Sequence, residues 1–400
     1  MRHTSLSANG KTVMEHLKRF LVGPEQIGTL MKAVRKELDD YRTPQTTSSN
    51  MFCTTVQALP NKTETGDVLV MNLGTAYLHV LIVKLRGEDI NADEYMTYKI
   101  PADVRTGTSN QLMEFIADRV SMFLKIKDLL HKSHSVGFVL SFPCKYDTAG
   151  DLTTARLAKW TKGFCCKDVE DKKWRELLQQ AFKKKTVCKL EIKAIVNNLV
   201  ALFMSAVRED DKCSIAVVFG NGFSACYLQQ GEGQSTSGNE NNTTEKVIVS
   251  TESGALGEDG SLDDLITEFD KTLDQNTVNP GKQILEKMIG SLYLGEIVRL
   301  VLLKLIKQGL LFSALYSEYT SFNKKGGFST EHVALIQSDT SDDHSITQKV
   351  LQKIEVDSFD AEDCNIVKYV CRIVFQRAAY LAAAGNNLRI YPIYCLFGTR

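Results

Sequence analysis

The stretch Asp67-Val-Leu-Val-Met-Asn-Leu-Gly-Thr-Ala-Tyr-Leu-His-Val-Leu-Ile-Val-Lys-Leu85 decides the fold class of this chain. It contains two apolar runs, residues 67–73 and 78–85, and Gly74 lies between them. Apolar runs of this length on either side of a glycine predict two strands joined by a tight turn. We therefore expect a β-hairpin here.

A second group of strands follows the same plan further along the chain. Apolar runs at residues 214–219 and 224–229 flank Gly220-Asn-Gly222, and a third run covers residues 246–250. Two groups that each open with strand, glycine turn and strand indicate a duplicated architecture. The polar tract at residues 231–244 is predicted to be a loop inside the second group.

The segments around these hairpins alternate between strand and helix patterns. The predicted strands are residues 95–100, 135–141 and 189–195, and the predicted helices are 24–41, 110–126, 171–183, 197–207, 279–307 and 365–384. Residues 42–66 are predicted to be an irregular connector, and Asn279 and Pro280 to begin the helix that Gly309 ends. Hairpins combined with strand–helix–strand units indicate an α/β fold with a mixed sheet.

The bulk composition excludes several classes of protein. The 400 residues carry 48 Lys+Arg and 48 Asp+Glu, so no basic excess points to nucleic acid or to an anionic membrane. No apolar run is long enough to span a bilayer, and no secretory signal opens the chain. The ten cysteines include no Cys-x-x-Cys pair, which favours free thiols in a reducing, cytoplasmic compartment.

Three longer strings carry a family resemblance. The first is Leu140-Ser-Phe-Pro-Cys144 with Lys159-Trp-Thr-Lys-Gly-Phe164, the second is Glu258-Asp-Gly-Ser-Leu-Asp-Asp-Leu265 with Thr267-Glu-Phe-Asp270, and the third is Asn279-Pro-Gly-Lys-Gln-Ile-Leu-Glu-Lys-Met288 with Leu292-Tyr-Leu-Gly-Glu-Ile-Val-Arg-Leu300. In order and spacing these strings resemble the signatures of eukaryotic hexokinases, over roughly residues 20–384.

The resemblance implies the actin-like ATPase (ribonuclease H-like) fold, an α/β fold in which two domains close over a cleft. It implies an N-terminal helix and connector at residues 1–60, a small domain at 61–196 and a large domain at 197–400. The family's activity is transfer of a phosphoryl group from ATP, with Mg²⁺, to the 6-hydroxyl of a hexose such as glucose.

The positions that the family uses for the sugar are largely kept. Carboxylates, a lysine and neutral polar side chains suit a ring of hydroxyls, because they donate and accept in fixed directions. The resemblance assigns hexose binding to Ser141, Thr161, Lys162, Asn197, Ser224, Glu252 and Glu286. Ser224 departs from the family, which has a longer Asn in the turn that here reads Gly220-Asn-Gly-Phe-Ser-Ala225.

The phosphate side departs further. The family's first phosphate loop reads Asp-Leu-Gly-Gly-Thr/Ser, and the equivalent segment of this chain is Asn72-Leu-Gly-Thr-Ala76. Asn72 lacks the charge that offsets a magnesium ion, and Thr75 places a branched side chain where a glycine lets backbone N–H groups approach phosphates. We therefore expect two degraded phosphate loops, which contain Gly74, Thr75, Ala76, Gly220 and Gly222. The rest of the sequence shows no residue spacing that is typical of a metal site.

The family's general base is also missing. Val-Asn-Asp-Thr in the family corresponds to Val196-Asn-Asn-Leu199, so Asn198 replaces the Asp that takes the proton of the sugar hydroxyl. Loss of a general base lowers a rate by roughly 10²–10⁴. Three hypotheses follow: a weak or inactive kinase that still binds hexose, a working but slow hexokinase, and a non-catalytic scaffold or regulatory protein.

The segment after Gly385 matches nothing in the family pattern. Family members continue with a strand, a glycine turn and a helix that complete the large domain, whereas residues 386–400 resemble none of these. A large domain truncated in this way would leave a sheet edge and apolar surface uncovered. We therefore expect reduced stability, or a protein partner on that surface.

Overall fold

The described part of the chain divides into two units. A computed structural model describes residues 8–42, 50–56, 58–185, 188–230, 246–312, 320–356 and 358–397. Unit 1 consists of Met1–Ser49, Phe219–Phe223 and Ser253–Arg400, and unit 2 of Asn50–Val218 and Ser224–Glu252. The three domains inferred from the family resemblance have other boundaries, and these stay a prediction.

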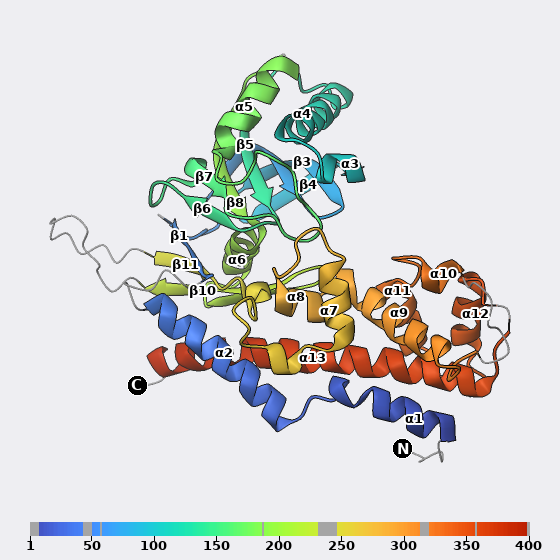
Figure 1. Cartoon of the computed structure of the whole chain (residues 1–400). Helices are drawn as coiled ribbons and strands as arrows, with labels where there is room; N and C mark the ends of the chain where they lie inside the picture. Colours follow the sequence, from blue (N-terminus) through green and yellow to red (C-terminus); the bar gives the residue numbers. More distant parts are fainter. Residues whose placement is uncertain are drawn as a thin grey trace. The chain divides into compact units, whose positions relative to one another are not determined.

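A five-stranded mixed sheet forms the centre of unit 2 (Figure 1). Its strands are β2 (Thr65–Leu73), β3 (Tyr77–Arg86), β4 (Asp89–Lys99), β5 (His134–Leu140) and β8 (Leu190–Asn197). They lie in the order β4-β3-β2-β5-β8, with β2, β3 and β4 antiparallel and with β5 parallel to both β2 and β8. The hairpin and the mixed sheet predicted from the sequence are confirmed.

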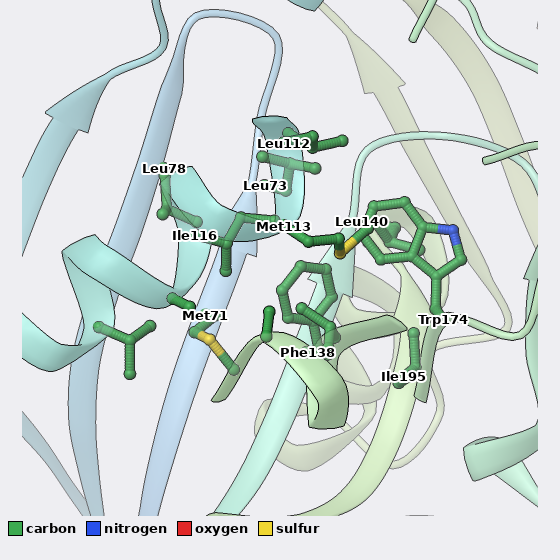
Figure 2. Close-up of a cluster of buried hydrophobic side chains, with 14 of the residues drawn as sticks. Met71, Leu73, Leu78, Leu112, Met113, Ile116, Phe138, Leu140, Trp174 and Ile195 are labelled. Carbon is green, nitrogen blue, oxygen red and sulfur yellow. The ribbon is translucent and has the colours of Figure 1, made fainter. Parts of the chain in front are cut away.

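The core of unit 2 lies on one face of this sheet. Alternate residues of β2, namely Leu69, Met71 and Leu73, are completely buried there, as the period of two in a strand requires. Figure 2 shows Met71 and Leu73 near Phe138 of β5 and near Leu112 and other side chains. The helices α4 (Ser109–Ile126) and α5 (Trp174–Lys185) pack against each other and cover this face.

A second sheet belongs to the same unit. It contains β1 (Phe52–Val56), β9 (Ile215–Phe219), β10 (Phe223–Gln230) and β11 (Lys246–Ser250), in the order β1-β11-β10-β9. The helix α6 (Asn198–Glu209) packs on it through Leu199 and Phe203. The connector predicted at residues 42–66 is wrong in part, because β1 pairs antiparallel with β11, a partner about 190 residues away that local pattern cannot reveal.

Shorter elements complete unit 2. They are α3 (Ala102–Arg105), β6 (Cys144–Tyr146), η2 (Leu152–Thr154) and β7 (Ala155–Leu157), and β6 pairs with β7. The loop predicted at residues 231–244 lies outside the described residues.

Unit 1 is mainly helical. Its elements are α1 (Ala8–His16), η1 (Lys18–Phe20), α2 (Pro24–Arg42), η3 (Ser253–Ala255), η4 (Asp263–Leu265), α7 (Glu268–Gln275), α8 (Ile284–Ile289), α9 (Ser291–Lys307), α10 (Thr320–Asn323), α11 (Thr330–Gln337), α12 (Ser345–Lys353) and α13 (Ala361–Phe397). The helices predicted at residues 24–41 and 365–384 are confirmed as α2 and as part of α13. In the described residues no helix is long and apolar enough to cross a membrane.

The single helix predicted from Asn279 to residue 307 is wrong. The chain forms a turn around Gly281, starts α8 only at Ile284, and breaks at Gly290 before α9. A Cβ atom at position 290 would lie 2.8 Å from the carbonyl oxygens of Asn221 and Glu286, so the backbone approaches closely here and a glycine is required. The apolar spacing continues across the break, which explains why periodicity alone suggested one helix.

Candidate functional site

Several of the predicted site residues lie where parallel strands of unit 2 end. Asn72 pairs with Val139 at the end of β2, and Leu140 at the end of β5 pairs with Asn197 at the end of β8. The carboxyl ends of β2, β5 and β8 therefore lie side by side, and Ser141 and Asn198 immediately follow two of them. In α/β folds, ligands bind at this edge of a parallel sheet.

Aromatic packing fixes the loop that carries Thr161 and Lys162. The ring of Phe142 lies edge-on to Trp160 and to Phe164, with centroids 4.8 Å away in each case. The Nζ atom of Lys162 donates to the carbonyl oxygen of Ser141 at 2.7 Å. The two halves of the first signature string thus pack on each other. The string therefore has a structural role in addition to the chemical role that the resemblance implies.

Two polar side chains beside these loops, Thr161 and Asn197, differ in their hydrogen bonding. The hydroxyl of Thr161 is buried and has no hydrogen-bond partner among the described residues. Asn197 uses its carboxamide twice, since Nδ2 donates to the carbonyl oxygen of Phe142 at 2.7 Å and Oδ1 accepts from the N–H of Leu199 at 2.7 Å as the N-cap of α6. Thr161 is therefore positioned for an external polar group, whereas Asn197 also has a structural role.

Ser224 lies in β10 of the second sheet of unit 2, and Glu252 follows the end of β11 in the same sheet. The Ser224 hydroxyl is buried, and the described residues give it no hydrogen-bond partner. The carboxylate of Glu252 is 9% exposed and accepts from the Ser250 hydroxyl at 2.7 Å. Burial, and secondarily the charge of Glu252, raises the pKa of the Cys144 thiol.

In unit 1, Glu286 lies beside a residue that the sequence analysis missed. A Cβ atom on Gly254 would lie 2.6 Å from Oε1 of Gln283 and 3.3 Å from Oε2 of Glu286, so both side chains converge over this glycine. Gln283 is 3% exposed, and its Nε2 atom has no hydrogen-bond partner among the described residues. Its string was interpreted as a family signature and as the start of a helix, with no site role for Gln283, whereas the left-handed backbone of Gln283 (φ 54°) removes it from a helix.

The glycine turn Gly220–Gly222 is tied to the same part of unit 1. The Gly220 N–H donates to the carbonyl oxygen of Gly222 at 2.9 Å, and the Ser291 N–H donates to the carbonyl oxygen of Gly220 at 2.8 Å. The N–H of Phe223, the next residue, donates to Oε2 of Glu286 at 3.3 Å. The turn and the Glu286 carboxylate are therefore held as one piece.

The first glycine turn joins β2 to β3. The Gly74 N–H donates to the carbonyl oxygen of Tyr77 at 2.9 Å, and Thr75 and Ala76 form the half-buried tip. Behind the tip, Oδ1 of Asn72 is buried and has no hydrogen-bond partner in the described part of the chain. The structure thus forms a tight turn at this position, and a neutral amide stands where the family pattern has a carboxylate.

The residues do not fit a magnesium ion as a family carboxylate would. Asn72 offers a single uncharged oxygen, and Asn198, half-buried in the first turn of α6, is also neutral. Across the described residues no group of three His, Cys, Asp or Glu side chains is placed to hold a metal. Oxygen donors with negative charge are what Mg²⁺ requires from a protein.

The comparisons with known proteins agree with this fold. Hexokinase family models match residues 12–207 and 214–387. The chain is 36% identical over 380 residues to hexokinase HKDC1 of Mus musculus and 32% identical over 381 residues to hexokinase-1 of Homo sapiens, in each case over 94% of this chain and 40% of the relative. A solved structure of hexokinase from Schistosoma mansoni complexed with glucose superposes with a TM-score of 0.86 at 32% identity, over 96% of this chain and 85% of that one.

This chain belongs to the hexokinase family, and its two sheets and their helices have the actin-like ATPase fold. It spans about 40% of the length of the curated relatives named above. The family implies the use of ATP and Mg²⁺. Which of the family's properties this chain retains depends on its own residues.

Proposed function

We propose that this chain binds a hexose of the glucose type and transfers a phosphoryl group from ATP poorly or not at all. The observation that carries the proposal is the contrast between its two sets of residues. The hexose set keeps its charged and polar side chains, while Asn72 and Asn198 have each replaced a carboxylate with an amide.

Hexose binding is supported by buried polar atoms that make no hydrogen bond within the described residues. A buried hydroxyl or amide that lacks a hydrogen bond costs about 1–3 kcal/mol, so such groups are rarely kept without a purpose. Thr161, Ser224 and Gln283 each present one such atom in the described structure. Lys162 and Glu252 of unit 2 and Glu286 of unit 1 are also of the donor and acceptor types that suit a ring of hydroxyls.

Weak phosphoryl transfer is supported by the loss of charge. Phosphoryl transfer depends chiefly on positioning and on neutralising charge through the metal. Asn72 contributes no charge to a metal, and Asn198 has no basic lone pair to receive the proton of the attacking hydroxyl. If ATP and Mg²⁺ bind here, we expect the backbone of the Gly74 and Gly220–Gly222 turns to contact the phosphates, with weakened affinity.

Calorimetric titration of the purified chain with glucose tests the first half of the proposal, with mannitol as an acyclic control. A coupled assay for hexose 6-phosphate tests the second half. We expect Asn198→Asp alone not to restore turnover, because Asn72, Thr75 and Ala76 still differ from the family's phosphate loop. Full activity of Asn198→Asp would mean that the phosphate loop is competent.

The two other hypotheses predict different results. A chain that binds no glucose, by titration or by thermal shift, would favour a non-catalytic scaffold or regulatory protein. Glucose binding combined with turnover within about tenfold of the 1–100 s⁻¹ that is typical of kinases would favour a working hexokinase.

The edge strand β9 is where we propose that a protein partner acts. In the described residues β9 pairs only with β10, and its Val217 and Phe219 side chains are 38% and 54% exposed. An apolar edge strand favours pairing with a strand of another polypeptide. A dilute monomer that melts in one cooperative transition at an ordinary temperature would count against a partner.

The free thiols also support our proposal of a cytoplasmic location.

A further inference from the structure

The ion pair between Lys287 and Asp274 joins α8, the helix that carries Glu286, to α7. We propose that this pair is a positioning device that holds Gln283 beside Glu286 in the geometry that binds hexose. The inference rests on the proposed hexose function and extends it to residues that do not face the ligand.

Gln283 needs such a device because its backbone is strained. It has φ 54° and ψ 48°, the left-handed region, which costs a residue with a Cβ atom roughly 1–2 kcal/mol. Its carbonyl oxygen accepts the first helical hydrogen bond of α8, from the Lys287 N–H at 3.0 Å, but its own N–H donates outside the helix because Gln283 precedes the first residue of α8. The conformation persists only if the surrounding structure fixes it.

Three polar anchors fix the turn around Gln283. Its own N–H donates to Oε1 of Glu258 at 2.9 Å. Two residues earlier, the Gly281 N–H donates to both carboxylate oxygens of Asp274, at 3.1 and 2.8 Å. The third anchor is Lys287, whose Nζ donates to Oδ1 of Asp274 at 2.5 Å and to the carbonyl oxygen of Asn279 at 2.7 Å.

Lys287 connects these anchors to the hexose carboxylate. It is 2% exposed and directly follows Glu286 in α8, so the helix that carries Glu286 is bonded to α7 and to the start of the turn that carries Gln283. Burial lowers the pKa of Lys287, and the charge of Asp274 opposes this shift. A buried ammonium group that is held this closely by a carboxylate fixes the separation of the two segments.

Removal of Lys287 should release the turn. The Asp274 carboxylate would lose its counter-charge, the carbonyl oxygen of Asn279 would lose its donor, and Gln283 could relax out of the left-handed region. Its amide would then leave the space over Gly254 that it shares with Glu286. Loss of one hydrogen bond to the sugar corresponds to roughly 3–10-fold weaker binding.

A double-mutant cycle, read out by titration with glucose, tests the proposal. We expect Gln283→Ala and Lys287→Met each to weaken glucose binding by roughly 3–10-fold. In the Gln283→Ala background, Lys287→Met should weaken glucose binding no further, although it should lower the melting temperature equally in both backgrounds. Lys304→Met, which removes an exposed ion pair with Glu268 in the same unit, is the matched control and should leave affinity unchanged.

The possible outcomes distinguish a failure of the positioning role of Lys287 from a failure of the proposed hexose function. If Lys287→Met binds glucose like the wild type, or if the two losses multiply, the pair is structural only and this inference fails while the proposed function stands. A wild-type chain that binds no glucose overturns both. If Lys287→Met does not fold, Asp274→Asn, which keeps an acceptor for the Gly281 N–H, replaces it in the cycle with the same expected result.

Discussion

Replacing Arg377 with methionine is expected to destabilise unit 1 severely. Arg377 of α13 is 2% exposed and donates to both carboxylate oxygens of Asp270, at 3.0 and 2.8 Å, and to the carbonyl oxygen of Leu265 at 3.1 Å. Its guanidinium lies over the ring of Phe20, 5.1 Å from the centroid. One side chain therefore ties α13 to α7, η4 and the N-terminal η1.

The magnitude follows from what the substitution leaves behind. Asp270 is 5% exposed, and it would keep its charge but lose its only salt-bridge partner among the described residues. Breaking one side of a buried ion pair costs about 3–5 kcal/mol. With a urea dependence of about 2 kcal/mol per molar, the unfolding midpoint of unit 1 should fall by about 1.5–2.5 M.

The assay can distinguish the units because both tryptophans, Trp160 and Trp174, belong to unit 2. Tryptophan fluorescence therefore follows unit 2, whereas far-ultraviolet circular dichroism follows mostly the helices of unit 1. The dichroism midpoint should shift more than the fluorescence midpoint. If neither midpoint moves, the reasoning about this ion pair is refuted.

A matched control separates charge from packing. The double variant Arg377→Met with Asp270→Leu removes both charges, and it should recover part of the lost stability, because well-packed apolar groups replace buried ion pairs at little cost. A double variant that is no more stable than Arg377→Met alone would show that the Asp270 carboxylate is needed mainly for the capping box, in which it accepts from the N–H and the hydroxyl of Thr267 at 2.7 and 2.6 Å.

Two further predictions concern the helices of unit 1. Gly295→Ala should destabilise the unit by more than about 2 kcal/mol, because a Cβ atom there would lie 2.4 Å from backbone atoms of Ser329 and Thr330 in a close-packed region. Gly28→Ala, in the open middle of α2, is the control and should stabilise slightly, and equal effects in urea melts would contradict the packing argument. The pKa of His332 is lowered by burial, and its Nδ1 accepts from the Ser329 N–H at 3.3 Å, which requires a neutral ring. Stability from this contact should be present above the ordinary pKa of about 6.5 and be lost as the pH falls through the lower, folded value. His332→Gln keeps an acceptor, so melts from pH 7.5 to 5 should show a weaker pH dependence, and an unchanged slope would exclude His332 as the cause.

The sequence predicted those elements whose signal is local. The hairpin at β2 and β3 follows from two apolar runs on either side of Gly74, and the helix predicted at residues 197–207 is confirmed as α6. The edge strand β1 and the break at Gly290 were missed. Both depend on long-range neighbours, the strand β11 for β1 and the Asn221 carbonyl for Gly290, which no window of sequence contains.

The residues of the candidate site likewise include some that the sequence identified and one that it missed. Ser141, Asn197 and Asn72 could be named because they lie in strings that carry the family resemblance, and the structure shows that they lie at or directly after the carboxyl ends of β5, β8 and β2. Gln283 was missed because the proline and asparagine before it are also typical of a helix start. A sign was available in Gly281, since a glycine one turn into a supposed helix argues for a turn instead.

The most direct test of the central claim is the steady-state rate of hexose 6-phosphate formation by the purified chain at saturating glucose, ATP and Mg²⁺. If the amides Asn72 and Asn198 cannot replace carboxylates, the rate should lie roughly 10²–10⁴-fold below the 1–100 s⁻¹ that is typical of kinases. The same preparation should still bind glucose in a calorimetric titration. A rate within the typical range would contradict the claim that charge at these two positions is required.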